Sequence, residues 1–304
     1  MTKKFYSNGK LLLTGEYLVL DGAKAFALPT KMGQDLQVTE TFEGDSIHWK
    51  SLDFDQTVWF ESTFSISSVI ANAFIEKEEN VEKVLHKILY EAHQLNPKIL
   101  PSKGFSVETN LTFPRFWGLG TSSTLINNVA QWFEINAFEL LKNSFGGSGY
   151  DIACAQNNSP LIYSIQDGKP YTELISFHPN FTENLYFLYL NQKQNSKSAI
   201  ATYYAKQFDI QDAKSEIDQI SLRIAKISSQ QEFEYLLHQH ETLLSDILEM
   251  ETVKKRFFHD FDGTIKSLGA WGGDFVLVVC DSNPKSYFES KGFTTLLSYN
   301  EMIL

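Results

Sequence analysis

The chain carries one segment whose glycines and hydroxyl residues are arranged as an anion-binding site. Gly118, Leu119 and Gly120 are followed without a gap by four hydroxyl residues, which are Thr121, Ser122, Ser123 and Thr124. Glycines let the backbone fold closely around an anion, and a helix that starts here directs N–H groups and the positive end of its dipole toward it. A helix cap needs a single hydroxyl residue, so the run of four favours an anion site. The Walker A pattern is absent, because no Gly-Lys-Ser/Thr closes the segment.

Two other segments supply a cation and a carboxylate. Lys10 follows Gly9 at the start of a segment that ends at Gly15-Glu16. A lysine that is fixed in place can neutralise charge that develops on a phosphate. Asp151 follows a glycine-rich stretch at the start of a short helical segment, where a carboxylate either caps the helix or accepts a proton from a hydroxyl. For both residues we favour function over a surface lysine and a simple cap.

A fourth glycine-bearing segment, Lys266–Asp274, precedes the apolar run Phe275–Cys280. Glycines that lead into a buried strand allow a ligand or another backbone to approach closely. Taken alone, the segment fits a tight turn equally well.

Strands and helices alternate along the chain around these segments. Period-two patterns and β-rich runs predict strands at Gly33–Phe42, Ser46–Trp49, Gln56–Phe60, Phe105–Phe113, Leu161–Ile165, Leu185–Leu190, Phe275–Cys280 and Phe293–Leu297. Helical spacing predicts helices at Val81–Leu95, Ser122–Phe133, from a break near Asn136 to Lys142, Ile217–Ile227, Phe233–Ile247 and after Pro284. The pattern predicts an α+β chain in two halves that join near residues 158–170.

Composition narrows the class of protein. The 304 residues include 43% hydrophobic residues and carry a formal net charge of -11, so we expect no nucleic-acid partner. The apolar run Leu11–Leu13 is too short for a signal peptide, and no stretch is long enough to span a membrane. We therefore expect a cytoplasmic protein that does not bind membranes. Cys154 and Cys280 lie in apolar stretches and are predicted to be buried free thiols.

Taken together and in this order, the four segments resemble the motifs of the GHMP kinase superfamily, and the resemblance runs from Gly9 to Cys280. Within it, Ser148–Ala153 is similar to the phosphomevalonate kinases, and Asn195-Ser196-Lys197 is similar to an element of the mevalonate and phosphomevalonate kinases. The resemblance implies a two-domain α+β GHMP fold, with an S5-like ATP-binding domain over residues 1–165 and a ferredoxin-like domain over residues 166–304.

The resemblance also implies roles for individual residues. ATP and Mg²⁺ are the implied cofactors, and the nucleotide phosphates would lie over Gly118, Leu119, Gly120, Thr121, Ser122 and Ser123. Asp151 and Lys10 are the implied catalytic residues, and the acceptor oxygen would lie between them. The implied substrate-binding residues are Glu16, Lys197, Gly269 and Ala270, and the implied metal ligands are Ser122 and Glu139. We expect at least one of Lys193 and Lys197 to face the acceptor, and we expect a monomer or a homodimer.

Several residues depart from the family pattern. The family's first, second and third motifs correspond here to Gly9–Glu16, Pro114–Ser123 and Gly269–Asp274. Phe116 and Trp117 replace small residues of the second motif, and Trp271 replaces a glycine of the third. The family's magnesium-binding glutamate would fall at Leu140, one position after Glu139. Mevalonate is our first choice of acceptor, phosphomevalonate is the alternative, and diphosphomevalonate decarboxylation comes third. A nucleotide-binding relative without turnover is the alternative from a different class. Outside the motifs, we expect His240 to be a core residue with its hydrogen bonds satisfied.

Overall fold

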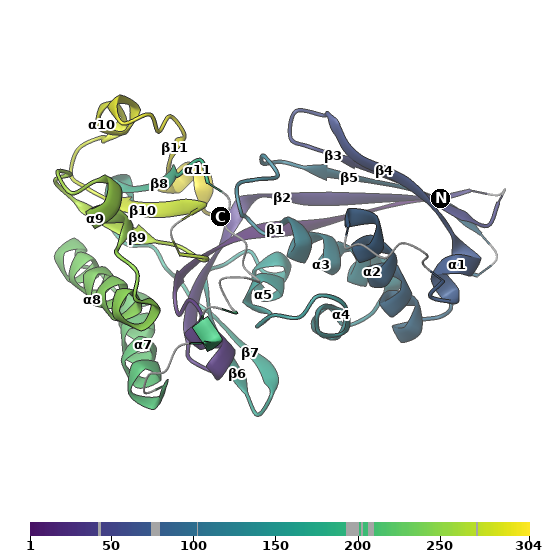
Figure 1. The fold of residues 1–304 in the computed structure, drawn as a ribbon, viewed down its shortest axis with the longest axis horizontal. Helices are drawn as coiled ribbons and strands as arrows, with labels where there is room; N and C mark the ends of the chain where they lie inside the picture. The colour runs from purple at the N-terminus through teal and green to yellow at the C-terminus, as the bar shows by residue number, and fades with distance from the viewer. Residues whose placement is uncertain are drawn as a thin grey trace. The chain divides into compact units, whose positions relative to one another are not determined.

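The computed structural model describes residues 1–41, 44–73, 80–101, 103–192, 201, 203–205, 210–271 and 273–304. The chain forms two compact units (Figure 1). The first unit comprises Met1–Gly9, Met32–Arg115 and Leu119–Gln156, and the second comprises Lys10–Lys31, Phe116–Gly118 and Asn157–Leu304. Each unit is thus built from separate stretches of chain. The division at residues 165 and 166 stays a prediction.

A sheet and five helices make up the described part of the first unit. Strands β1 (Thr2–Thr14) and β2 (Ala25–Thr41) run through both units and pair with each other, and the other strands here are β3 (Ser46–Leu52), β4 (Val58–Ser65) and β5 (Gly104–Leu111). The strand order is β4-β3-β5-β2, in which β3 and β5 are parallel and the other neighbouring strands are antiparallel. The helices are α1 (Ile66–Ile70), α2 (Val81–Leu95), α3 (Thr121–Phe133), α4 (Ala137–Ser144) and α5 (Tyr150–Gln156).

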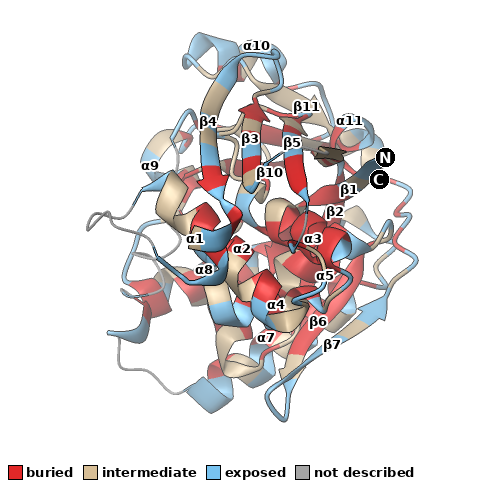
Figure 2. Cartoon of the chain, turned by 90° about the vertical axis from the view of Figure 1, so that its right-hand side faces the viewer, coloured by how far each residue is buried: buried red, intermediate tan, exposed pale blue. Residues whose placement is uncertain are grey.

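The core of the first unit lies between the sheet and these helices. Strand residues such as Trp49 and Phe105 pack in one apolar cluster with helix residues such as Leu89, Ile126 and Phe133. Helix α3 is buried over most of its length, as its red colour in Figure 2 shows. This burial fixes the direction in which the start of α3 points.

A second sheet, with the order β11-β8-β10-β9, forms part of the second unit. Its strands are β8 (Leu185–Tyr189), β9 (Thr264–Ser267), β10 (Phe275–Val279) and β11 (Leu296–Ser298), all antiparallel to their neighbours. The unit also holds the strands β6 (Leu161–Gln166) and β7 (Lys169–Leu174), of which β6 pairs with residues 25–27 of β2. Its helices are the short 3-10 helices η1 (Leu18–Asp21) and η2 (Thr182–Asn184), α7 (Ile210–Ile224), α8 (Gln230–Leu248), α9 (Val253–Phe257), α10 (Lys285–Ser290) and α11 (Tyr299–Met302).

The predicted α+β class is confirmed, and most elements lie where the patterns place them. Helix α3 ends at Phe133 as predicted, and α4 begins after Asn136, whose side chain accepts hydrogen bonds from two N–H groups of its first turn. Strands β7 and β9 were not predicted. Both cysteines are buried free thiols, as predicted. Among the described residues, no helix combines the length and apolar character that crossing a membrane requires.

Candidate functional site

The predicted anion loop of the first unit ends in an open helix start. Gly120 is the N-cap of α3 and has a left-handed backbone with φ of 99°, which favours glycine. Gly120 has no side chain, so the N-cap residue itself accepts no hydrogen bond from the first turn of α3. The side chains of Ser123 and Thr124 instead donate to the carbonyl oxygen of Gly120, at 2.9 and 3.0 Å. The N–H groups at the helix start are therefore left for another acceptor, as an anion site requires.

The four hydroxyl residues divide into two kinds. Ser123 and Thr124 are buried. Thr124 Oγ1 also lies 2.8 Å from Gln34 Oε1 on β2, so its one hydroxyl hydrogen is shared between the loop and the sheet. Ser122 is exposed and Thr121 is half-buried. A phosphate or metal role for the Ser122 hydroxyl stays a prediction. Ser123 can bind an anion through its backbone N–H while its hydroxyl keeps the hydrogen bond to Gly120.

Asp151 lies in the same unit, in the first turn of α5. Gly146, Gly147 and Gly149 precede it with positive φ angles, so the chain turns sharply before the helix begins. The Asp151 carboxylate is half-buried and accepts a hydrogen bond from the N–H of Ile152 at 3.0 Å. Helices α3 and α5 pack together, and the side chain of Gln156 donates to Asn127 at 3.0 Å. The anion loop and the predicted base thus stand on two helices that are joined in one core.

Lys10 and the third glycine motif come together in the second unit. Lys10 is half-buried on β1, and its Nζ lies 4.0 Å from the point that a Cβ atom would occupy at Gly269. Gly269 has φ of 63°, and Ala270 is half-buried beside it. The lysine of the first motif therefore lies close to the backbone of the third motif, although more than 250 residues separate them. Substrate contacts of Gly269 and Ala270 stay a prediction.

Asp274 closes the Gly-Gly-Asp ending of the third motif, which is similar to the phosphomevalonate kinases, but no role was predicted for its carboxylate. Its carboxylate lies against the Cα of Gly118, and a Cβ atom at Gly118 would overlap it. The Asp274 backbone donates to the carbonyl of Gln192 at 2.6 Å and accepts from the N–H of Leu190 at 2.8 Å. The only sequence signal for this contact is the run of glycines that leads into Asp274.

The three aromatic departures from the family pattern have structural partners in the second unit. The Trp117 ring packs edge-on against Phe275 with 5.4 Å between ring centroids, and the carbonyl of Phe116 accepts a hydrogen bond from the hydroxyl of Tyr189. Trp271 is buried in a cluster with Tyr17, and its backbone N–H donates to the Tyr17 hydroxyl at 3.2 Å. These residues therefore anchor the glycine segments that they interrupt.

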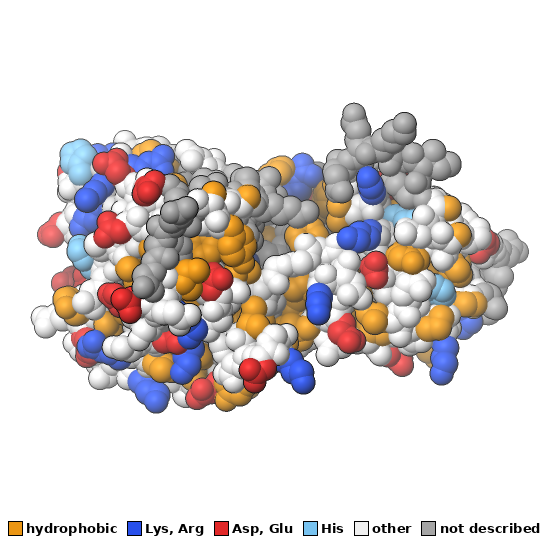
Figure 3. Space-filling view, turned by 60° about the horizontal axis from the view of Figure 1, so that its bottom comes forward, with side chains coloured by type: hydrophobic (Ala, Val, Ile, Leu, Met, Phe, Trp, Pro, Cys, Tyr) orange, Lys and Arg blue, Asp and Glu red, His pale blue; other side chains and the backbone are white. Residues whose placement is uncertain are grey.

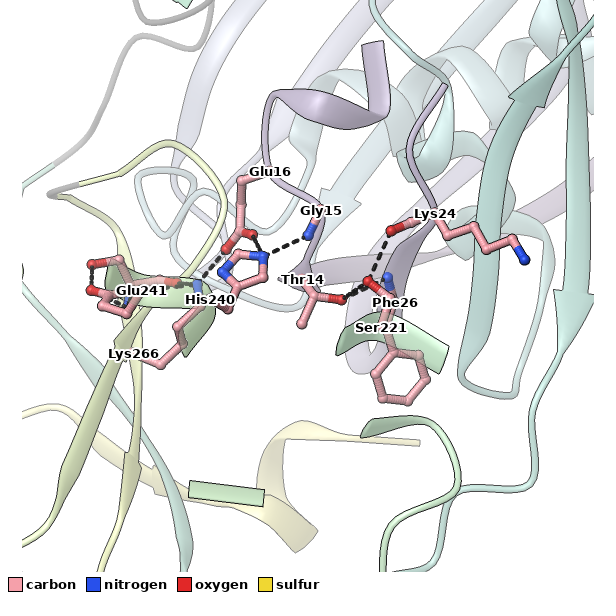
Figure 4. Close-up of polar contacts among 10 residues, drawn as sticks. Thr14, Gly15, Glu16, Lys24, Phe26, Ser221, His240, Glu241 and Lys266 are labelled. Atoms are coloured by element: carbon pink, nitrogen blue, oxygen red, sulfur yellow. Dashed lines mark hydrogen bonds and ion pairs between the residues drawn. The ribbon is translucent and has the colours of Figure 1, made fainter. Parts of the chain in front are cut away.

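A buried set of ionisable residues holds the end of the first motif (Figure 4). The side chains of Lys266, Glu16, His240 and Glu241 are at most 6% exposed. Lys266 Nζ lies 2.7 Å from Glu16 Oε1 and 3.5 Å from Glu241 Oε2. The second Glu16 oxygen, Oε2, lies 3.2 Å from His240 Nε2. The structure thus surrounds Glu16 with protein groups, and the substrate contact of Glu16 stays a prediction.

His240 is a core residue, as predicted, but only one of its ring nitrogens has a partner. Its Nε2 accepts a hydrogen bond from the N–H of Gly15 at 2.9 Å, and Nδ1 has no hydrogen-bond partner among the described residues. Burial, and then the nearby Lys266, hold the pKa of His240 well below its usual value. Burial raises the pKa of Glu16 to about 7, against the opposing effect of Lys266.

For the remaining predicted residues, the described part of the chain shows no contact that supports the predicted role. Glu139 is exposed in the first turn of α4, and Lys193 and Lys197 lie outside the described residues. Across the described ranges, no three His, Cys, Asp or Glu side chains come together as a metal site. The metal role of Glu139 and the acceptor role of Lys197 stay predictions.

Solved structures of GHMP kinases share this fold. A mevalonate kinase from Methanococcus jannaschii is 18% identical, with a TM-score of 0.70 over 98% of each chain. A Streptococcus pneumoniae phosphomevalonate kinase, in complex with phosphomevalonate and AMPPNP, is 16% identical, with a TM-score of 0.69 over 98% of this chain and 99% of that chain. A Lactococcus lactis galactokinase with bound galactose is 13% identical, with a TM-score of 0.68 over 95% of this chain and 88% of that chain. No protein-family model matches the sequence, and no curated protein does. The predicted GHMP kinase fold is therefore confirmed.

Proposed function

We propose that this chain is an ATP-dependent small-molecule kinase that transfers the γ-phosphoryl group to a hydroxyl of an acidic metabolite. The observation that carries the proposal is the uncapped start of α3 after Gly120, since such a helix start binds phosphate groups. The fold supports it, because the structures that share the fold include kinases with bound nucleotide or acceptor. The nucleotide phosphates would bind the backbone from Gly118 to Ser123.

Mg²⁺ would enter with the nucleotide and neutralise charge on its phosphates. Proteins usually hold this ion through substrate phosphates, water and one or two side-chain ligands, so the lack of a metal cluster among the described residues fits this role. The residues we propose as its protein ligands are Ser122, which is exposed at the start of α3, and Glu139.

Two residues carry the proposed chemical roles. We propose that Asp151 orients the acceptor hydroxyl and accepts its proton, since carboxylates in this role need only hydrogen-bond reach. Lys10 would neutralise charge on the transferred group. Its place beside Gly269 supports this role, because a glycine there leaves room around the ammonium group. Phosphoryl transfer depends mainly on positioning and charge, so few catalytic groups are needed.

We propose mevalonate as the acceptor, with phosphomevalonate as the second candidate. One assay separates these from the other acceptors of the fold: release of ADP measured with mevalonate, phosphomevalonate, homoserine and galactose at equal concentration. Turnover with mevalonate alone, or with phosphomevalonate alone, selects between the first two. Turnover with galactose alone would contradict an acidic acceptor.

A nucleotide-binding protein without turnover is the second candidate, because Phe116, Trp117 and Trp271 depart from the kinase pattern. Trp117 packs against Phe275 and Trp271 packs in a cluster with Tyr17, which accounts for these two departures without loss of activity. If ATP raises the melting temperature while none of the four acceptors releases ADP, this second candidate replaces the kinase.

A further inference from the structure

The buried set around Glu16 contains two hydrogen-bond acceptors in contact. Nε2 of His240 accepts the N–H of Gly15, so its lone pair faces the turn after β1. Oε2 of Glu16 lies 3.2 Å from that same nitrogen and has no other partner among the described residues. An ionised carboxylate is an acceptor only, and two buried lone pairs at this distance repel each other. A proton on one of the two atoms removes the conflict.

The surrounding charges indicate which atom holds that proton. Lys266 faces Glu16 from β9, and Glu241 and His240 face it from α8. The set contains one lysine and two glutamates, so two ionised glutamates would leave a net negative charge. A net charge that is buried away from water is unfavourable. A proton on Nε2 would displace the hydrogen bond from Gly15, whereas a proton on Glu16 lets the single lone pair of Nε2 be shared between the Gly15 N–H and the Glu16 O–H. The raised pKa of Glu16 and the lowered pKa of His240 agree with this assignment.

The set also fixes two backbone segments. His240 holds the N–H of Gly15, and Lys266 holds Glu16. Glu241 accepts both the N–H and the hydroxyl of Ser267, at the end of β9. The first segment follows the strand that carries Lys10, and the second leads to Gly269 beside it.

We propose that Glu16 is protonated and donates to Nε2 of His240, and that His240 and Lys266 act through this bond as positioning residues for Lys10 and the Gly269 loop. The positioning role rests on the proposed kinase function, whereas the assignment of the proton to Glu16 is independent of that function.

Two glutamine substitutions test the proton, because the structure assigns opposite chemistry to the two glutamates. In Glu16→Gln, the amide NH₂ replaces the O–H that donates to His240, and the amide oxygen still accepts from Lys266. In Glu241→Gln, an NH₂ group must face the donors of Ser267. We expect Glu16→Gln to melt within about 3 °C of the wild type at pH 5.5 and Glu241→Gln to melt at least about 6 °C lower, without nucleotide.

The pH dependence follows from the same assignment. The folded pKa of Glu16 lies above its ordinary value, so the stability it contributes is present at low pH and is lost as the pH rises through about 7. The wild type should therefore lose melting temperature relative to Glu16→Gln between pH 5.5 and 8.5. Infrared spectra of the wild type at pH 5.5 should contain a protonated carboxyl band that Glu16→Gln lacks. Equal losses in both glutamine variants at pH 5.5, or no such band, would overturn the assignment.

Substitutions of His240 test the positioning role. His240→Leu removes the acceptor for Gly15, and His240→Gln restores one near the position of Nε2. Hydrogen exchange at residues 15–16 and 267–271 should speed up at least tenfold in His240→Leu and stay near wild type in His240→Gln, and kcat should follow the same order. Unchanged exchange in a folded His240→Leu protein would overturn this role. If the wild type transfers no phosphoryl group, only the kinase proposal fails. The melting and exchange measurements would still decide whether Glu16 is protonated and whether His240 positions the two segments.

Discussion

At the scale of single residues, the structure separates groups that can act on a ligand from groups that build the site. Ser123 and Thr124 turn their hydroxyls back onto the carbonyl of Gly120 and are buried. Ser122 and Asp151 keep exposed or half-buried side chains. The sequence presents the four hydroxyl residues as equivalent, and only the fold shows that two of them are structural.

The first prediction concerns the proposed catalytic pair. Asp151→Asn and Lys10→Met should each lower kcat at least about a hundredfold while the melting temperature stays within a few degrees, because base and charge-stabilising groups typically contribute on this scale. Asp167→Asn and Lys169→Met, which change exposed residues at the turn between β6 and β7, are the matched controls. Near-normal turnover in a folded Asp151→Asn or Lys10→Met protein would remove that residue from the mechanism.

The second prediction concerns the anion loop. Gly120→Val should weaken ATP binding at least tenfold in calorimetry, because a β-branched residue resists the left-handed backbone that shapes the loop. Gly168→Val is the control for backbone strain alone. Gly168 has φ of 71° in the β6–β7 turn, and a Cβ atom there would meet open space. ATP binding that falls equally in both variants, or in neither, would mean that the loop only begins a helix.

At the scale of elements, residues 116–118 are attached to the sheet of the second unit. The Phe116 carbonyl accepts from Tyr189 of β8, Trp117 packs on Phe275 of β10, and the Asp274 carboxylate lies against Gly118. This short segment directly precedes Leu119 and the start of α3 in sequence. The Trp117 side chain and the Phe116 backbone are thus attachment points for the segment that leads into the anion loop.

The third prediction tests this attachment. Gly118→Ala should lower the free energy of unfolding by about 2–4 kcal/mol, because the new Cβ combines a left-handed backbone with an overlap that forces repacking. Gly292→Ala has a similar φ of 88° in open space and should cost only about 1–2 kcal/mol. In an Asp274→Ala background, the cost of Gly118→Ala should fall to that of Gly292→Ala in urea denaturation. Equal costs in both backgrounds would show that Asp274 does not restrict Gly118.

The elements and the motif segments could be predicted from sequence, and their partners could not. Helix α3 shows its apolar spacing and its glycines directly, so its start and end were predicted closely. Strand β9 was missed because it is only four residues long and places the charged Lys266 in a buried position. The contact of Lys266 with Glu16 joins residues 250 positions apart, and no local pattern encodes such a pairing. His240 looked like an ordinary core residue for the same reason.

At the scale of the whole molecule, the net charge of -11 limits how an acidic acceptor can bind. A protein of this charge does not attract an anion by its overall field, so specific basic groups must hold it. Acidic and basic side chains are scattered over the described surface on the face in Figure 3. Binding of an acidic acceptor therefore depends on individual cations such as Lys10, which is half-buried beside Gly269.

The last prediction follows from the way the two units divide the chain. Residues 10–31 belong to the second unit, where they supply Glu16 to Lys266, the N–H of Gly15 to His240, and the β2 partner of β6. A fragment of residues 157–304 lacks all three contacts and leaves Lys266 buried with one carboxyl group fewer. Leaving a buried charged donor without its hydrogen-bond acceptor costs at least about 1–3 kcal/mol, which is a sizeable part of the ~5–15 kcal/mol that stabilises a typical domain.

We therefore expect the fragment 157–304 to show no cooperative thermal transition in near-UV circular dichroism. A chain in which a flexible Gly/Ser linker joins residues 10–31 to residues 157–304 should regain the transition, because it restores the missing strands and Glu16. The same linked chain with Glu16→Leu separates the two contributions, since it restores the strands but not the partner of Lys266, and it should melt lower than the linked parent. A cooperative transition in the fragment 157–304 alone, at the temperature of the linked chain, would show that the second unit does not need its N-terminal segment.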